Sequence, residues 1–158
     1  MNLSKAVGDH MQTMHYHHLL IMVVLSFISM YVLMYAMVDT FSNVFMSFNQ
    51  FYMAGLMTAP MVIIEVVVMG AMYANKRLNT IIIAGSLIAL AAFFFFIRQQ
   101  TLIGDAQFLR SMIPHHAGAV LMCQQASIQD PEIKELCRGI VAGQQSEIDV
   151  MKAKLDAL

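Results

Sequence analysis

Charge is scarce in this sequence, above all in its N-terminal part. Only 12% of the 158 residues are charged, about half the usual share in a soluble domain. Residues 1–98 hold seven charges and the last sixty residues hold the other twelve. The net charge is −1, and no basic run points to nucleic acid or to strong binding of anionic lipid. We therefore expect a membrane part, a water-facing part and no nucleic-acid partner.

Three long apolar runs occupy the part that lacks charge. Residues 19–38 and 81–97 contain no charged side chain, and residues 51–74 contain only Glu65. A helix needs about 20 residues to cross a bilayer, with about 17 as the lower limit. The sequence predicts an all-α protein with a transmembrane domain at 19–98, between an N-terminal segment (1–18) and a helical domain (99–158). A cleaved signal peptide is the alternative for the first run, but no cleavage site follows it.

The few basic residues predict the orientation. With three spans, Lys5, Lys76 and Arg77 lie on one side of the membrane and Arg98 on the other. Because basic residues favour the cytoplasmic side, we expect a cytoplasmic N-terminus and a periplasmic or extracellular C-terminal domain, in a bacterial inner membrane. Residues 75–80 read as a short turn, and Asn79 as the N-cap of the third span.

The C-terminal domain reads as two antiparallel helices. Residues 105–122 place apolar and polar side chains at intervals of three and four, which is helical spacing. Asp130, Pro131 and Glu132 then have the order of a helix start. If the chain reverses near residue 130, positions equidistant from it should face each other. Cys123 then faces Cys137, Met112 faces Glu147 or Ile148, and His115 and His116 face Gln144 and Gln145.

This seam collects groups that bind soft metals. Neutral imidazole together with thioether suits copper(I), and thioether favours silver(I). The candidate ligands of this site are Met112, His115, His116, Met122, Glu147 and Met151. Glu147 is either a ligand or a carboxylate that orients an imidazole. The alternative is a set of hydrogen-bonded core histidines.

These residues also carry a family resemblance. The pattern is Asp105-x-x-Phe108-x-x-x-Met112-Ile-Pro-His115-His116-x-x-Ala119-x-x-Met122, then Ile140-x-x-x-Gln144-x-x-Glu147-Ile148-x-x-Met151. It resembles the Domain-of-Unknown-Function 305 family over residues 100–155. The resemblance implies a ferritin-like helical fold, an association with copper and other metals, and export from the cytoplasm. It also implies that Asp105, Met112, His115, His116, Met122, Gln144, Glu147 and Met151 belong to the family's site.

The chain departs from the family pattern at two cysteines and lacks the aromatic residue often found near the end of the second helix. Outside the cytoplasm, Cys123 and Cys137 would form a disulfide. In the cytosol, both thiols could join the metal ligands. The predicted orientation favours the disulfide.

Sixteen methionines suggest a second feature, a stripe along the second span. Met53, Met57, Met61, Glu65 and Met69 are four residues apart and wind slowly around a helix. The stripe is either a path for metal ions or ordinary packing by an adaptable side chain. Glu65 either belongs to a cation or proton path or is hydrogen-bonded to Ser26 or Ser29.

The N-terminal segment is rich in histidine and methionine. His10, Met11, Met14, His15, His17 and His18 could form a second metal site. The alternative is an interfacial segment whose imidazole rings lie among lipid headgroups.

The leading hypothesis is a membrane-anchored protein that binds copper(I) or silver(I) for storage, buffering or transfer in metal homeostasis or resistance. Its expected partners are the lipid bilayer, further copies of itself and other metal-handling proteins. We identify no catalytic constellation, and no nucleotide-binding loop that would support pumping. One alternative is a ferritin-like metal-dependent redox enzyme, although Glu-x-x-His pairs are absent. The other is a structural or adaptor membrane protein without metal.

Overall fold

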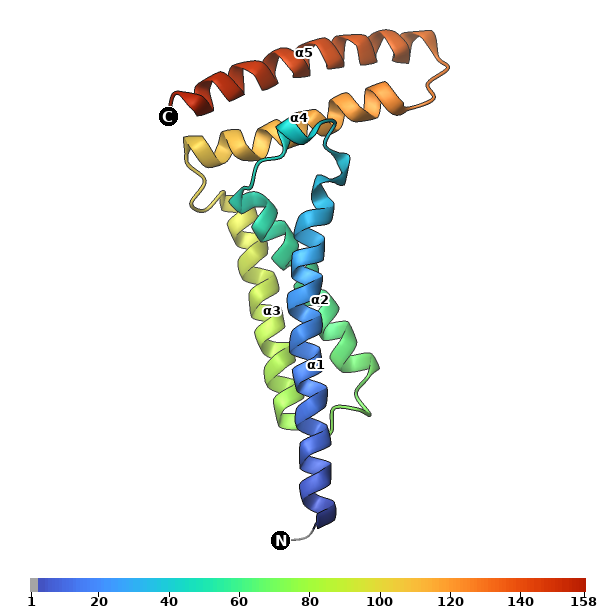
Figure 1. The fold of residues 1–158 in the computed structure, drawn as a ribbon, viewed down its shortest axis with the longest axis vertical. Coiled ribbons are helices and arrows are strands. Elements are labelled where there is room, and N and C mark those ends of the chain that lie inside the picture. Colours follow the sequence, from blue (N-terminus) through green and yellow to red (C-terminus); the bar gives the residue numbers. More distant parts are fainter. Residues whose placement is uncertain (1–2) are drawn as a thin grey trace. The chain divides into compact units, whose positions relative to one another are not determined.

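The computed structural model describes the backbone of residues 3–158 and the side chains from residue 13 onward. Within these residues the fold is all helical and contains no strand, which confirms the predicted fold class (Figure 1). The α-helices are α1 (Leu3–Leu33), α2 (Phe48–Val68), α3 (Lys76–Gln99), α4 (Asp105–Gln125) and α5 (Pro131–Asp156). Two short 3-10 helices, η1 (Met34–Met37) and η2 (Phe41–Asn43), lie between α1 and α2.

The chain divides into two compact units. The three-helix unit combines the N-terminal residues up to Tyr31 with Tyr52–Gln99. The hairpin unit combines Val32–Phe51 with Gln100–Leu158. The connection between α1 and α2 therefore belongs with the C-terminal helices.

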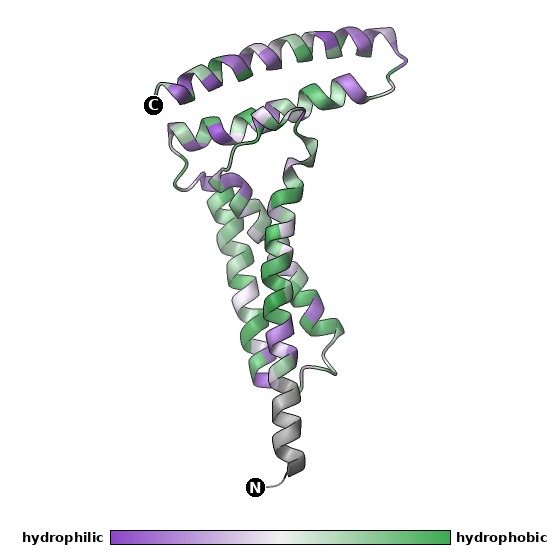
Figure 2. Ribbon diagram, in the orientation of Figure 1, coloured by the Kyte–Doolittle hydropathy of each residue, from purple (hydrophilic) through white to green (hydrophobic). Residues whose placement is uncertain are grey.

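Three helical segments are long and apolar enough to cross a membrane. They are Thr13–Met37, Phe48–Val68 and Lys76–Gln99. Little of the first segment and none of the third is buried inside the protein, so their apolar side chains face outward. Figure 2 shows this apolar character along α1, α2 and α3, in contrast to the mixed colours of α4 and α5. Such surfaces are expected where lipid is the solvent.

The connection between α2 and α3 differs from the prediction. Helix α2 ends at Val68 rather than near residue 74, and α3 begins at Lys76 rather than near residue 81. The predicted N-cap at Asn79 is wrong, because the side chain of Asn75 accepts the hydrogen bond from the Leu78 amide (3.0 Å). Asn75 directly precedes the helix, where free amides need an acceptor.

The hairpin unit is built around the contact between α4 and α5. Its buried core consists of Ile113, Ala117, Val120, Ile148 and Met151. The side chain of Asp130 accepts hydrogen bonds from the amides of Glu132 and Ile133, and Pro131 starts α5, as predicted. From the connection between α1 and α2, Val38 and Phe45 pack against the same core. The segment 32–51 therefore covers part of a hairpin that is small for an independent core.

Candidate metal centre

One imidazole is held between a backbone carbonyl and a carboxylate. The Nδ1 of His116 lies 2.9 Å from the carbonyl oxygen of Met112, one turn earlier in α4. A carbonyl oxygen can only accept, so Nδ1 carries the proton of this hydrogen bond. The other nitrogen, Nε2, lies 2.7 Å from Oε2 of Glu147 on α5. The geometry therefore fixes the ring and directs Nε2 at Glu147.

Burial on the two helices places this pair at the edge of the seam. The neighbours Ala117 and Ile148 are fully buried, which fixes the rotation of α4 and α5 about their axes. As a result, His116 is largely covered, with 11% of its side chain exposed, whereas the side chain of Glu147 is 61% exposed. The imidazole is thus largely covered, whereas the outer side of the carboxylate is open to solvent.

A pair of methionines lies next to the imidazole–carboxylate pair. Met112 precedes His116 by four residues, so the two side chains are neighbours on the surface of α4. Met151 follows Glu147 by four residues, so these two are neighbours on α5. Met151 is buried in the hairpin core, and Met112 packs against that core. Two methionine side chains therefore pack in the seam, Met112 one helical turn from His116 and Met151 one helical turn from Glu147.

The other predicted ligands are more scattered. His115 is exposed, and its ring centre lies 6.0 Å from that of His116. Gln144 is half-buried one turn before Glu147, and Met122 is exposed. Asp105 begins α4, about 16 Å along the helix axis from His116. Among the described side chains, no three His, Cys, Asp or Glu residues lie together as a metal site.

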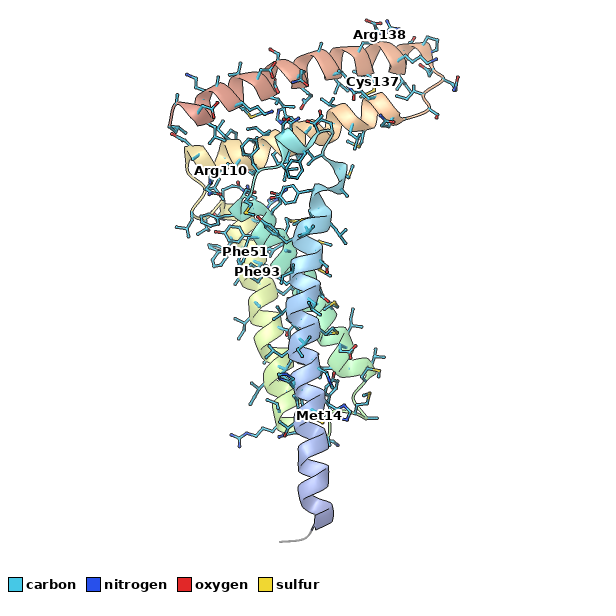
Figure 3. The ribbon with its side chains drawn as sticks, in the orientation of Figure 1. Met14, Phe51, Phe93, Arg110, Cys137 and Arg138 are labelled. Atoms are coloured by element: carbon cyan, nitrogen blue, oxygen red, sulfur yellow. A yellow bond between two sulfur atoms is a disulfide. The ribbon has the colours of Figure 1, made fainter. Side chains whose placement is uncertain are left out.

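The two cysteines link α4 and α5 close to the turn of the hairpin. Cys123 of α4 and Cys137 of α5 form a disulfide, with their Cα atoms 5.3 Å apart. Figure 3 shows Cys137 on the side of α5 that faces α4, whereas Arg138 points away from it. The sulfurs are therefore unavailable as thiolate ligands while the bond is intact.

A polar cluster joins α1 to the connection between α2 and α3. The Tyr16 hydroxyl donates to the side-chain oxygen of Asn79 (2.7 Å), whose amide donates to the carbonyl of Tyr73 (2.8 Å). The Tyr16 and Tyr73 rings are 5.3 Å apart. Sequence reasoning missed this cluster and assigned Asn79 only as a helix cap, because no spacing signal connects positions so far apart in the chain.

Glu65 belongs to this end of the three-helix unit. The Tyr73 hydroxyl donates to its carboxylate at 3.3 Å, so the described partner is Tyr73 rather than Ser26 or Ser29. Because α2 ends at Val68, Glu65 lies in its last turn and not near its middle. Burial, followed by the nearby charge of Glu65, raises the pKa of Tyr73 above its ordinary value.

The predicted methionine stripe lies mainly outside the packed face of α2. Met53 and Met57 are exposed, whereas Gly55, Thr58 and Val62 are buried. Met61 is half-buried, and Met69 lies beyond the end of the helix. Within one chain, Met53 and Met57 therefore face the surroundings rather than the neighbouring helices.

The N-terminal histidine-rich run continues directly into the first candidate span. Met14, His17 and His18 are exposed on α1 and His15 is half-buried. Tyr16, which lies within the run, brings it to the connection that precedes Lys76 and Arg77. His10 and Met11 lie outside the described side chains.

The structure thus defines an all-α protein with three candidate membrane spans and a disulfide-linked C-terminal helical hairpin. Residues 99–155 match the family model described as "Domain of unknown function (DUF305)". A relative, "Uncharacterized protein L153" of Acanthamoeba polyphaga mimivirus, is 32% identical over 141 residues, covering 87% of this chain and 91% of the relative. The chain belongs to this domain-of-unknown-function family.

The similarity to that relative extends beyond the family domain. An alignment over 87% of the chain must include much of the three-helix unit as well as residues 99–155. No solved structure matches the chain.

Proposed function

We propose that this protein is a membrane-anchored binder of copper(I) or silver(I), which it stores, buffers or transfers. The observation that carries the proposal is the arrangement of His116. Histidine ligands of metals commonly donate their second ring N–H to a backbone carbonyl or a carboxylate, which fixes the ring and its tautomer. The Nδ1 contact to Met112 leaves Nε2 as the ligand atom.

The carboxylate of Glu147 occupies the position beside Nε2 that a metal ion would take. At 2.7 Å from Nε2, its carboxylate leaves no room for an ion between the two atoms. Because Glu147 is 61% exposed, its side chain can turn outward and then either bind the ion or leave it to softer ligands. His115 is the nearest further imidazole.

The thioethers of Met112 and Met151 favour soft ions over zinc or iron. Copper(I) and silver(I) prefer sulfur and imidazole, whereas carboxylates suit harder ions. Methionine side chains are unbranched and adaptable, so a rotamer change can turn a sulfur toward the next turn of the hairpin. Unlike thiols, they stay available as ligands while cysteines are oxidised to a disulfide.

The basic residues and the disulfide both support a C-terminal domain outside the cytoplasm. Tyr16 brings the histidine-rich run to the end of the three-helix unit that carries Lys76 and Arg77, which favours the cytoplasm for that end. Three crossings would put the C-terminal helices on the opposite side, in the periplasm or outside the cell. A Cys123–Cys137 disulfide is stable in such a compartment.

Transfer through the membrane would involve several copies. Met53 and Met57 face outward from a single three-helix unit. A path along the stripe would therefore form only where stripes of neighbouring copies meet. Binding at the hairpin does not depend on such a path.

Metal loading of the purified full-length chain in detergent micelles tests the proposal. Samples are incubated separately with copper(I), silver(I), zinc(II) and iron(II), freed of unbound ions, and analysed for metal per chain. We expect wild-type protein to retain copper or silver and His116→Ala to retain less of it per chain, because the hairpin site is lost while the N-terminal histidines remain. Met112→Leu, which removes the sulfur but keeps an apolar side chain, should weaken retention.

His115→Ala is the matched control, because His115 is adjacent and exposed. It should keep more of the bound metal than His116→Ala. Helix content and the absence of free thiols show that the variants are folded. Wild-type protein that retains no soft metal, or a folded His116→Ala that retains all of it, would refute the proposal.

A further inference from the structure

Two glycines on α5 have no explanation within a single chain. Gly139 and Gly143 lie inside the helix and are exposed, and neither has a positive φ that would require glycine. A Cβ added at either position would meet no atom within 4 Å. Glycine inside a helix costs about 1 kcal/mol relative to alanine. The two positions make sense where another backbone approaches α5 closely.

The glycines belong to a row of exposed residues that runs along α5, here called the α5 stripe. The row continues at helical intervals of three and four through Glu132, Leu136, Glu147, Val150 and Lys154. Leu136 is 61% exposed and Val150 is 57% exposed. The stripe runs beside the face of α5 that is packed on α4. Gly143 is two residues, about 200° around the helix, from the core position Val141, whereas Glu147 borders the packed face and reaches His116 of α4.

The order of the side chains in the stripe is self-complementary. If a second α5 crosses antiparallel at Gly143, positions equidistant from Gly143 face each other. Glu132 then faces Lys154, Leu136 faces Val150, and the two Gly143 residues meet at the centre. Neither Glu132 nor Lys154 makes an ion pair in the described part of the chain. In the antiparallel pair, acidic side chains thus face basic ones and apolar side chains face apolar ones. In a parallel pair, each Glu132 would face the Glu132 of the other copy, and each Lys154 the other Lys154.

We propose that the α5 stripe is a docking surface for α5 of a second copy, antiparallel and centred on Gly143. Apolar contact between Leu136 and Val150 supplies attraction, and the Glu132–Lys154 pairs select the antiparallel direction more than they add affinity. The acidic residues of the stripe disfavour anionic lipid as the occupant.

Such pairing would also affect the proposed metal site, and this consequence rests on the proposed function. Glu147 is part of the stripe and faces Gly139 of the second copy in this register. The second copy would then cover the exposed side of Glu147 and His116. One chain alone does not gather three His, Cys, Asp or Glu ligands in its described part. The interface with a second copy would shield the site from solvent.

Cysteine cross-linking of the full-length chain in its native membrane tests the pairing. In Gly143→Cys, the two introduced thiols meet at the centre, where Cα atoms closer than about 7 Å can be bridged. Ala142→Cys is the matched control, because Ala142 is adjacent, exposed and on another side of α5. After mild oxidation, we expect a dimer on non-reducing gels for Gly143→Cys and monomer for Ala142→Cys.

Charge exchange tests the direction. Glu132→Lys should weaken dimerisation at least fivefold, measured by light scattering in detergent, and Glu132→Lys combined with Lys154→Glu should restore it. Equal cross-linking of both cysteine variants, or no rescue by the double exchange, would overturn the proposal. Cross-linking without soft-metal retention would refute only the proposed function, and metal retention by a strictly monomeric protein would refute only the pairing.

Discussion

The disulfide between Cys123 and Cys137 gives the sharpest quantitative prediction for the hairpin. The two cysteines are 14 residues apart in sequence and enclose the turn between α4 and α5. Closing a loop of about 15 residues removes enough freedom from the unfolded chain to stabilise the fold by about 3 kcal/mol. We expect the double variant Cys123→Ser with Cys137→Ser to lose that amount, because serine is close to cysteine in size.

Hydrogen exchange followed by mass spectrometry measures this loss in the full-length protein in micelles. A loss of about 3 kcal/mol corresponds to roughly a hundredfold faster exchange of amides that open with the hairpin. Peptides around Ile113 and Ile148 should report the change, because they contain the buried core. Peptides from α3 serve as the internal reference.

Reduction of the wild-type protein provides an independent control. A reductant should accelerate exchange of the wild-type hairpin to the rate of the double variant and leave the variant unchanged. The reasoning is refuted if exchange changes less than tenfold, or if unreduced wild-type protein carries two reactive thiols.

Two further predictions concern the three-helix unit. Gly55→Ala should lower the stability of this unit by about 1–3 kcal/mol, because the new Cβ would overlap the Phe93 ring. Gly85→Ala is the control, because its new Cβ meets open space, and thermal unfolding in micelles compares the two variants. The raised pKa of Tyr73 means that the folded protein holds the phenol proton more tightly than the unfolded chain, so stability is retained below pH 10 and falls as the pH rises through the folded pKa. Ultraviolet titration of wild-type protein, compared with Tyr73→Phe, should show that Tyr73 ionises late, and Glu65→Gln should shift this ionisation only part of the way back, since burial is the larger cause. A late ionisation that Glu65→Gln leaves unchanged would contradict the contribution of Glu65.

The membrane-spanning character could be predicted from composition, but the ends of the helices could not. A segment with few charged residues is expected to lie in lipid rather than in water, and the three apolar runs match three helices. The residues after Val68 are also apolar, yet they form a turn that contains Gly70. An apolar turn carries no change in hydropathy, so the expected span ran past the end of α2. Asn79 and Glu65 were misplaced for the same reason.

The hairpin could be predicted more closely, because its turn is marked by specific residues. Asp130 and Pro131 fix the start of α5, and counting outward from the turn places Cys123 opposite Cys137. The same count places His116 opposite Gln144 or Gln145, whereas the structure pairs it with Glu147. Side chains lean along a helix, so two long ones can meet almost a turn away from the positions that face each other. Sequence spacing locates the seam but not the partner within it.

The small core of the hairpin connects the two proposals. The two helices form a hydrophobic core of five buried residues, with Val38 and Phe45 as added cover, and leave the exposed face of α5 that carries the stripe without a packed helix in the described part of the chain. Glu147 belongs both to that face and to the contact with His116. Any ion that moves the Glu147 carboxylate therefore changes the surface offered to a second copy, and any second copy restricts how that carboxylate can move. Because such coupling is reciprocal, the two proposals together predict that soft metal shifts the dimerisation equilibrium by the same factor by which dimerisation shifts the affinity for the metal.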